Sequence, residues 1–292
     1  MSRGLSRRTG ALVALLLMLA LGINTAGHRA VAAEPVAFPD IQRILDAGVI
    51  RVAIRARDAA PMIMTAADGT LTGSEPDLAR DLAAKLGVSV TFVRTADTYD
   101  GVVDVVANKA ADIAVSYLSG GVRRARYVYF SQPYVQQSER FLFNRARFAQ
   151  IKRDHGIESI RAIHEVAEAA ALEVGVIAGS VYETNRERDF PGSRLRRFDT
   201  LHEMMEAVRS GQIFAAVSGG LQVDYYLRRH PATAIYVAVD PDIHQPDDIR
   251  IAVRPDAPNL LRWVNVYLAN HVGMLEDAEI VRRYLERVED GQ

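Results

Sequence analysis

The chain of 292 residues contains no cysteine, which excludes disulfide bonds, zinc sites built from thiolates and a lipid-modified N-terminal cysteine. An exported protein without thiols suits the periplasm, where stray thiols are oxidised. An excess of charge of one sign is also lacking, because 35 basic and 36 acidic residues give a formal net charge of −1. The composition therefore implies no basic face for nucleic acid.

Motifs for several kinds of chemistry are absent as well. The seven histidines show no paired spacing of the kind that holds a metal, and neither a glycine-rich phosphate loop nor a nucleophile elbow is present. We therefore expect no metal and no cofactor. The whole chain is 49% hydrophobic and 24% charged, which is typical of a soluble globular protein. Its length fits two compact units.

The first 33 residues have the pattern of a secretory signal peptide. Arg3, Arg7 and Arg8 precede the apolar run 11–22, and small residues at 30–33 offer cleavage sites. The apolar run is too short to span a membrane. Removing residues 1–33 takes away four arginines and no acid, so the net charge falls from −1 to −5. We expect a periplasmic protein cleaved near residue 32 or 33, exported by the twin-arginine or, as we favour, the general secretory route.

Strand and helix patterns alternate along the rest of the chain, which indicates an α/β fold with largely parallel sheets. Helices are expected over 41–47, 78–86, 100–107, 155–170, 201–210, 224–229, 259–271 and 277–288. Strands are expected over 49–54, 88–93, 113–115, 138–144, 172–176, 194–198, 213–217, 235–239 and 249–254.

One stretch, residues 112–134, carries most of the functional signal. An apolar strand leads into a turn of serines and glycines, and then into a short basic segment with Arg123, Arg124 and Arg126. Free backbone N–H groups, hydroxyls and a helix N-terminus favour an anion, and an arginine can bind a carboxylate through two parallel hydrogen bonds. The alternative is a surface turn followed by a solvated basic helix.

This stretch resembles the core motif of the family 3 periplasmic solute-binding proteins, which bind amino acids. The positions in register are Asp112, Ser116, Ser119, Arg124, Phe130, Ser131, Pro133 and Tyr134, while Gly121 stands where the family usually has threonine. The resemblance implies the type II, Venus flytrap fold, with two mixed, mostly parallel sheets joined by a two-strand hinge. Lobe 1 would comprise residues 34–138 and 242–292, and lobe 2 residues 139–241.

The same resemblance implies a ligand site between the lobes. Arg124 would bind a ligand carboxylate with help from Ser119 and the backbone near Gly121, and Tyr99 and Tyr117 would shape the pocket. Gly179 and Ser180 would face the ligand from lobe 2, although Ser180 also suits a plain helix N-cap. The implied partners are a small carboxylate ligand, an amino acid or an organic acid, and an ABC-type inner-membrane permease, with the protein itself a monomer.

Two departures from the family pattern bear on the ligand. Phe214 and Gly219 stand where amino-acid binders usually carry aspartates, so the partner for the ligand ammonium group is missing. The loop that usually holds an acid and an aromatic reads Arg55-Ala56-Arg57-Asp58 here, and its arginines either face solvent, which we favour, or enter the cleft. These changes favour an acidic or non-amino carboxylate, and the alternative is that Asp58 or Glu75 turns inward and supplies the missing charge.

The chain also resembles the cyclohexadienyl dehydratases, exported enzymes of the same fold, in the segments IQRILDAGVIRVAI and YYLRRHP. Gln222 occupies the position of their catalytic acid. Because an amide cannot act as a general acid or base at neutral pH, we expect a binding protein and not an enzyme. The alternative is a degenerate, enzyme-like or partner-docking relative of the fold.

Overall fold

The computed structural model describes residues 36–168, 170–240 and 246–289, and from Phe38 onward they belong to one compact unit. The predicted signal peptide and the predicted boundary near residue 241 lie outside the described residues. Within the described ranges no helix is long and apolar enough to cross a membrane.

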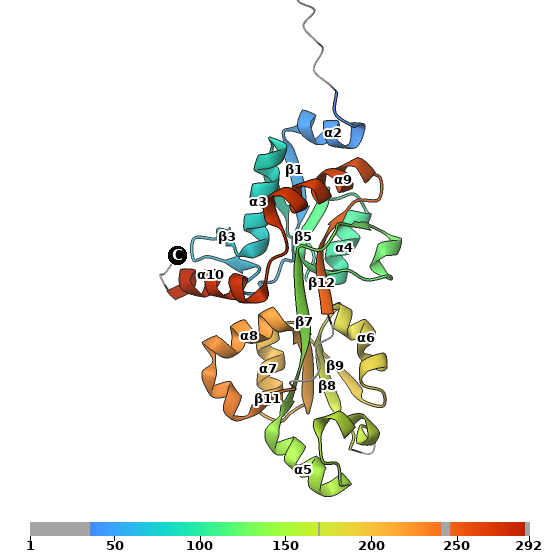
Figure 1. Cartoon of the computed structure of the whole chain (residues 1–292), viewed down its shortest axis with the longest axis vertical. Coiled ribbons are helices and arrows are strands. Elements are labelled where there is room, and N and C mark those ends of the chain that lie inside the picture. Colours follow the sequence, from blue (N-terminus) through green and yellow to red (C-terminus); the bar gives the residue numbers. More distant parts are fainter. Residues whose placement is uncertain (1–35, 169, 241–245, 290–292) are drawn as a thin grey trace, which may run out of the picture. The chain divides into compact units, whose positions relative to one another are not determined.

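Strands and helices alternate, which confirms the α/β class, and most strands join one mixed sheet (Figure 1). Its order is β4 (Ser89–Val93), β1 (Val49–Ala53), β5 (Ile113–Ser119), β12 (Pro246–Val253), β7 (Val135–Asn144), β10 (Ala215–Gly219), β8 (Glu173–Ile177) and β9 (Arg194–Phe198). The short strands β6 (Tyr129–Phe130) and β11 (Val237–Val239) pair with β12 and β7. A separate hairpin pairs β2 (Met64–Thr65) with β3 (Leu71–Thr72).

The long strand β7 joins two halves of this sheet. Its first residues pair with β12, ending at Ser138 opposite Pro246, and the next residue, Glu139, pairs with Gly219 of β10. We call β4, β1, β5, β12 and β6 the first half-sheet, and β10, β8, β9 and β11 the second. Parallel pairs link β4–β1–β5 in one and β10–β8–β9 in the other, whereas β7 and β12 run antiparallel to their neighbours.

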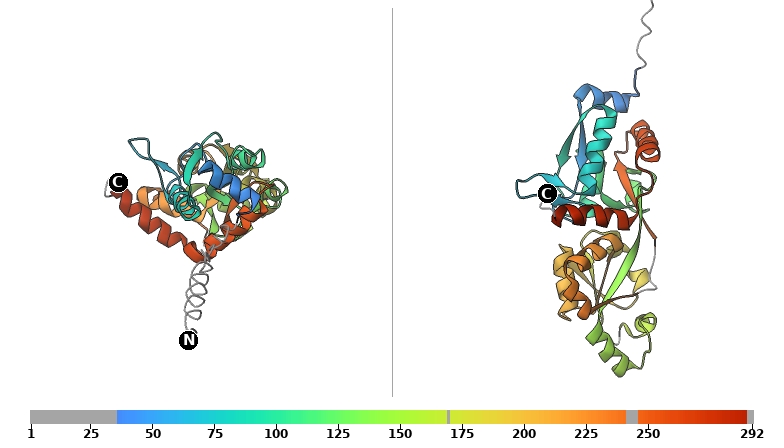
Figure 2. Two further views of the ribbon diagram at one scale, coloured as in Figure 1. Left: turned by 90° about the horizontal axis from the view of Figure 1, so that it is seen from above. Right: turned by 60° about the vertical axis from the view of Figure 1, so that its left-hand side comes forward.

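Helices flank both half-sheets. The first carries α2 (Pro39–Ala47), α3 (Ser74–Leu86), α4 (Tyr99–Ala107) and α9 (Pro258–Tyr267), which continues into a π-turn over Leu268–Val272. The second carries α5 (Arg145–His155), α6 (Val181–Asp189), α7 (Leu201–Arg209) and α8 (Gly220–Arg229), with short 3₁₀ turns at Ile160–Val166 and Pro231–Ile235. The last helix, α10 (Asp277–Glu289), packs against α8 and β7 (Figures 1 and 2).

The helix predicted over residues 155–170 is wrong. The helix in this region is α5, which begins ten residues earlier after Asn144, whose side chain accepts a hydrogen bond from the Arg147 amide. Gly156 ends it in the left-handed conformation (φ 69°). The segment that follows forms only a 3₁₀ turn, because its apolar residues Ile157, Ile160, Ile163 and Val166 recur every three residues, which is the period of a 3₁₀ helix.

The apolar core explains one departure from the family pattern. Phe214 is fully buried in the core of the second half-sheet, where its ring lies 6.3 Å from that of Phe143 and 6.4 Å from that of Phe141. An aspartate at this position would bury an unpaired charge. Phe214 therefore has a packing role.

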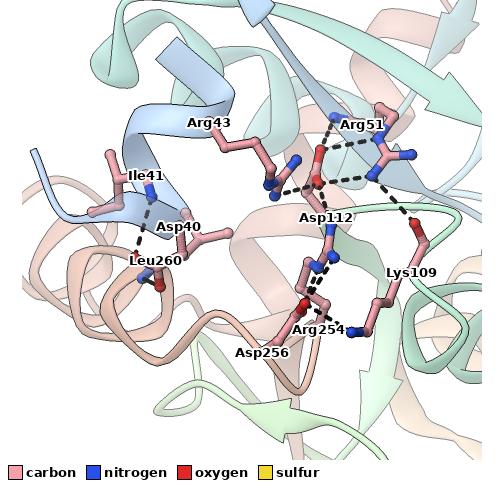
Figure 3. A network of polar contacts seen from close by, with 9 residues as sticks. All are labelled: Asp40, Ile41, Arg43, Arg51, Lys109, Asp112, Arg254, Asp256 and Leu260. Carbon is pink, nitrogen blue, oxygen red and sulfur yellow. Dashed lines mark hydrogen bonds and ion pairs between the residues drawn. The ribbon is translucent and has the colours of Figure 1, made fainter. Parts of the chain in front are cut away.

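The first residue of the central motif is also structural. Asp112 is 1% exposed and accepts hydrogen bonds or ion pairs from Arg43, Arg51 and Arg254, at 2.9, 3.0 and 3.3 Å (Figure 3). Burial alone would raise the pKa of Asp112, but the hydrogen bonds from Arg51 and the charge of Arg43 overcome this and lower it. The carboxylate thereby ties α2 and β1 to the segments that flank β5 and β12.

Candidate functional site

A small cavity, here called cavity 1, lies where side chains from the two half-sheets meet. Five of the residues predicted to bind ligand line it: Tyr99, Tyr117, Ser119, Arg124 and Ser180. The other lining residues are Gln137, Ile177, Val181, Tyr182, Ser218 and Gln222. The centre of a water molecule has only about 20 Å³ to move in. The walls are therefore almost in contact.

The three glycines predicted for the site do not line cavity 1. The carbonyl of Gly179 accepts a hydrogen bond from Arg124, and its positive φ of 66° suits glycine. A Cβ on Gly219 would lie 2.5 Å from Oε1 of Gln137, so a larger residue there would displace the end of that side chain. Gly121 accepts a hydrogen bond from the amide of Ala125 at the start of the 3₁₀ turn Arg124–Arg126.

Arg124 is buried, and its guanidinium links both half-sheets. Nε donates to Oδ1 of Asp100 at 2.8 Å and Nη1 donates to the carbonyl of Ser119 at 3.0 Å. Nη2 donates to the carbonyl of Gly179 at 2.9 Å, on the side of the second half-sheet. A guanidinium has five N–H donors, so one remains on each terminal nitrogen for a further acceptor.

Ser180 faces cavity 1 from the second half-sheet with an unused hydroxyl. The residue is 5% exposed, and its Oγ is the one buried side-chain oxygen or nitrogen of the described residues that has no hydrogen-bond partner. It therefore does not act as an N-cap for α6, which was the simpler of the two roles that the sequence suggested for Ser180. A buried polar group without a partner costs free energy and is an uncommon feature.

A carboxylate that sequence reasoning missed lies behind the wall of cavity 1. Asp247 of β12 accepts hydrogen bonds from Tyr182 (2.6 Å), Ser119 Oγ (2.9 Å) and Gln137 Nε2 (3.0 Å). Burial raises the pKa of Asp247, an effect that these hydrogen bonds and the nearby charge of Arg124 partly offset. No motif pointed to this residue, whose neighbour Asp248 pairs with Arg250 at 2.7 Å.

A second buried acid holds Tyr117 in place. Glu75 is 1% exposed and accepts hydrogen bonds from the hydroxyl of Tyr134 at 2.5 Å and the amide of Tyr117 at 2.6 Å. Burial raises the pKa of Glu75 to about 7, against the effect of both hydrogen bonds. Tyr117 has φ 52°, an uncommon conformation for a residue other than glycine, and such strain gathers at binding sites.

The hydroxyl of Tyr117 contacts a third acid, at the start of α10. It lies 3.4 Å from Oδ1 of Asp277 and 3.3 Å from Oε1 of Gln137. Burial, with a contribution from the nearby charge of Asp224, raises the pKa of Asp277 to about 6. Near cavity 1, the carboxyl groups of Glu75, Asp247 and Asp277 therefore accept hydrogen bonds from the hydroxyls of Tyr134, Tyr182 and Tyr117.

Of the two arginines in the loop after β1, Arg55 points inward and Arg57 does not. Arg55 is 3% exposed; its Nε donates to the carbonyl of Asp97 (2.7 Å) and its Nη2 to that of Asp199 (2.8 Å). The favoured interpretation, that both arginines face solvent, is wrong for Arg55. The side chain of Arg57 is 41% exposed and pairs with Asp97 and Asp199 at 3.6 and 3.3 Å.

The site holds hydrogen-bond donors, aromatic rings and one buried guanidinium, which suit the binding of an anion. Among the described ranges there is no group of three or more histidine, aspartate or glutamate side chains that could hold a metal ion. Gln222 lines cavity 1, and its Nε2 lies 3.4 Å from the hydroxyl of Tyr99.

Comparison with known proteins points in the same direction. Residues 50–287 match the sequence profile of the bacterial extracellular solute-binding proteins, family 3. Over 99 residues the chain is 33% identical to the cyclohexadienyl dehydratase of Pseudomonas aeruginosa, a match that spans 34% of this chain and 36% of that enzyme. Over 202 residues it is 24% identical to the L-cystine-binding protein TcyJ of Escherichia coli K12, spanning 69% and 70% of the two chains.

Among solved structures, the chain is similar to an ancestral amino-acid-binding protein described as a precursor of cyclohexadienyl dehydratase. The TM-score is 0.66 at 26% sequence identity, and the match covers 85% of this chain and 98% of that one. The predicted two-lobed, type II fold is thereby confirmed.

Proposed function

Because the chain belongs to family 3 of the bacterial extracellular solute-binding proteins, we propose that it captures a small carboxylate-bearing ligand in the periplasm for an ABC-type transporter. The observation that carries this proposal is the pairing in cavity 1 of the buried Arg124 with the unused hydroxyl of Ser180. The two residues come from different half-sheets, so a ligand carboxylate between them would contact both.

The proposal includes two lobes that move relative to each other. Lobe 1 comprises residues 34–138 and 242–292, and lobe 2 residues 139–241. The change of partner along β7 between Ser138 and Glu139 supports this division. Since cavity 1 has little free volume, the lobes part to admit the ligand and then close over it.

In this mechanism Arg124 gives charge-assisted hydrogen bonds to the ligand carboxylate, and the hydroxyl of Ser180 gives another. Tyr99 and Tyr117 shape the pocket. An amino acid remains within the proposed ligand class, because Asp247 lies behind Ser119 and could offset the charge of an ammonium group. An organic acid would leave Asp247 bound to Tyr182, Ser119 and Gln137 as it stands.

Calorimetry with Arg124→Ala tests the proposal. Loss of a buried guanidinium from its carboxylate should cost about 2–5 kcal/mol of binding free energy. Arg126→Ala is the matched control, because Arg126 belongs to the same 3₁₀ turn, is exposed and should not affect binding. Circular dichroism checks folding, since Arg124 also bonds to Asp100 and two carbonyls. Unchanged affinity in the folded variant would remove Arg124 from the site.

A second candidate function is the dehydration of a cyclohexadienyl substrate, favoured by the 33% identity over 99 residues to the enzyme. Gln222 lines cavity 1 at the position that the resemblance gives to the catalytic acid, and an amide does not titrate near neutral pH. We therefore propose binding without turnover. Conversion of a cyclohexadienyl substrate by the unmodified protein, followed by absorbance, would reverse this choice.

A further inference from the structure

A second and larger cavity, here called cavity 2, adjoins the first. The centre of a water molecule can move over about 410 Å³ in it. Ile177 and Gln222 line both cavities, so the two are neighbours separated by side chains. The remaining walls come from the loop after β1, on the side of the first half-sheet, and from α7 and α8 on the side of the second.

Arg55 places a buried positive charge in the wall of cavity 2. Its Nε and Nη2 bond only to backbone carbonyls, and it forms no ion pair with any residue that the structure describes. Nη1, with two N–H donors, has no hydrogen-bond partner among those residues. Arginine remains protonated when buried, so its charge has to be balanced by dipoles or by an anion.

The other ionisable side chains around cavity 2 do not supply that anion. Arg229, His202 and His230 line it from α7 and from the end of α8. Asp58 is the one acid that lines the cavity among the residues the structure describes, and it pairs with Arg94 at 3.1 Å and accepts hydrogen bonds from Thr65. The cavity therefore has an excess of positive charge.

Tyr99 connects Arg55 to the proposed carboxylate site. The guanidinium of Arg55 lies over the ring of Tyr99, 4.8 Å from its centroid, and Tyr99 lines cavity 1. The contact between Gln222 Nε2 and the Tyr99 hydroxyl is long, at 3.4 Å. It therefore closes only part of the boundary between cavity 1 and cavity 2. A ligand anchored at Arg124 and extending past Tyr99 would reach Arg55.

We propose that cavity 2 is a second anion subsite, in which Arg55 binds another acidic group of the same ligand. The ligand class is then a molecule with two acidic groups, a dicarboxylate or an acidic amino acid. This inference rests on the proposed function, since it takes the first carboxylate to be bound at Arg124. Arg55 is the residue that determines specificity for the second group.

Calorimetry with matched pairs of probes tests the inference. Each pair has the same carbon number and differs in one acidic group: butanoate and succinate, pentanoate and glutarate, norvaline and glutamate. In the unmodified protein the acidic member of at least one pair should bind about 10- to 100-fold more tightly, as expected for hydrogen bonds to a charged group. Arg55→Gln should abolish this difference and leave the affinity for the weaker member unchanged.

Arg57→Gln is the control, because Arg57 contacts the same two residues, Asp97 and Asp199, but is half-exposed and does not line cavity 2. This variant should keep the preference for the acidic member. If Arg55→Gln does not fold, the comparison in the unmodified protein still decides the question. Equal affinity within every pair would overturn the second subsite and leave the proposed function intact, whereas binding of none of the six probes would count against both.

Discussion

Replacing Ser180 with alanine should affect stability and binding in opposite directions. Its hydroxyl is buried in the wall of cavity 1 and has no partner among the described residues. Desolvating such a group without a hydrogen bond costs about 1–3 kcal/mol. Alanine removes that cost but also a few packing contacts, so we expect the ligand-free variant to be about 1 kcal/mol more stable. For a domain of this size, this corresponds to a rise in Tm of about 2–4 °C.

Binding should become weaker in the same variant. If the hydroxyl donates to a ligand carboxylate, the lost hydrogen bond to a charged group is worth about 1.5–3 kcal/mol. The dissociation constant should then rise roughly 10- to 150-fold. A residue with a purely structural role would not show this combination, because its loss would lower stability and leave affinity nearly unchanged.

Ser131→Ala provides the matched comparison for thermal unfolding and calorimetry. Ser131 is 1% exposed, and its Oγ donates to the carbonyl of Gln132 at 2.6 Å and accepts from the amide of Ile251 at 3.0 Å. Its removal should lower stability by about 1–3 kcal/mol without weakening binding, since it lies outside cavity 1. The reasoning fails if Ser180→Ala is destabilised as much as Ser131→Ala, or if it retains full affinity.

Two further predictions concern buried acids. The pKa of Glu75 rises from 4.5 to about 7 on folding, so its contribution to stability is full below pH 4.5 and is lost as the pH rises through 7; the shift corresponds to roughly 3 kcal/mol. Glu75→Gln should reduce the fall in urea stability between pH 5 and 8, leaving the slope due to Asp247 and Asp277, whose pKa values are also raised. An unchanged slope would contradict this assignment. Asp112 has a lowered pKa, so its contribution is present at neutral pH and is lost in acid. Asp112→Asn should cost about 2–3 kcal/mol at pH 7, less than for a fully buried pair because Arg43 and Arg51 are 43% and 37% exposed, and should cost less at pH 3. Equal losses at the two pH values would show that the carboxylate charge is not what stabilises this cluster.

The parts of the site that could be predicted from the sequence are local. Ser119 and Arg124 are five residues apart in one strand and the turn that follows, so their proximity depends only on short-range geometry. The same holds for the glycine-ended helix α3 and for strand β5. The motif without gaps contains three residues that line cavity 1, Tyr117, Ser119 and Arg124.

The contacts that sequence reasoning did not predict join residues that are far apart in the chain. Glu75 and Tyr134 are 59 residues apart, Ser119 and Asp247 are 128 apart, and Arg55 contacts Asp199 144 residues away. The inward direction of Arg55 depends on the carbonyls of Asp97 and Asp199, which only the folded chain brings together. No periodicity or turn signal contains that information.

The two arginines assigned to ligand anions also connect the two half-sheets in the structure described. Arg124 donates to the carbonyl of Gly179 and Arg55 to that of Asp199, both on the side of the second half-sheet. Each such hydrogen bond contributes only about 1 kcal/mol net, so these two bonds connect the half-sheets only weakly. A ligand can favour the closed state only by the difference between its affinities for the two states. A ligand with two acidic groups would add an anionic acceptor at Arg124 and another at Arg55. Closure of the two proposed lobes over the ligand would then depend on both groups being present.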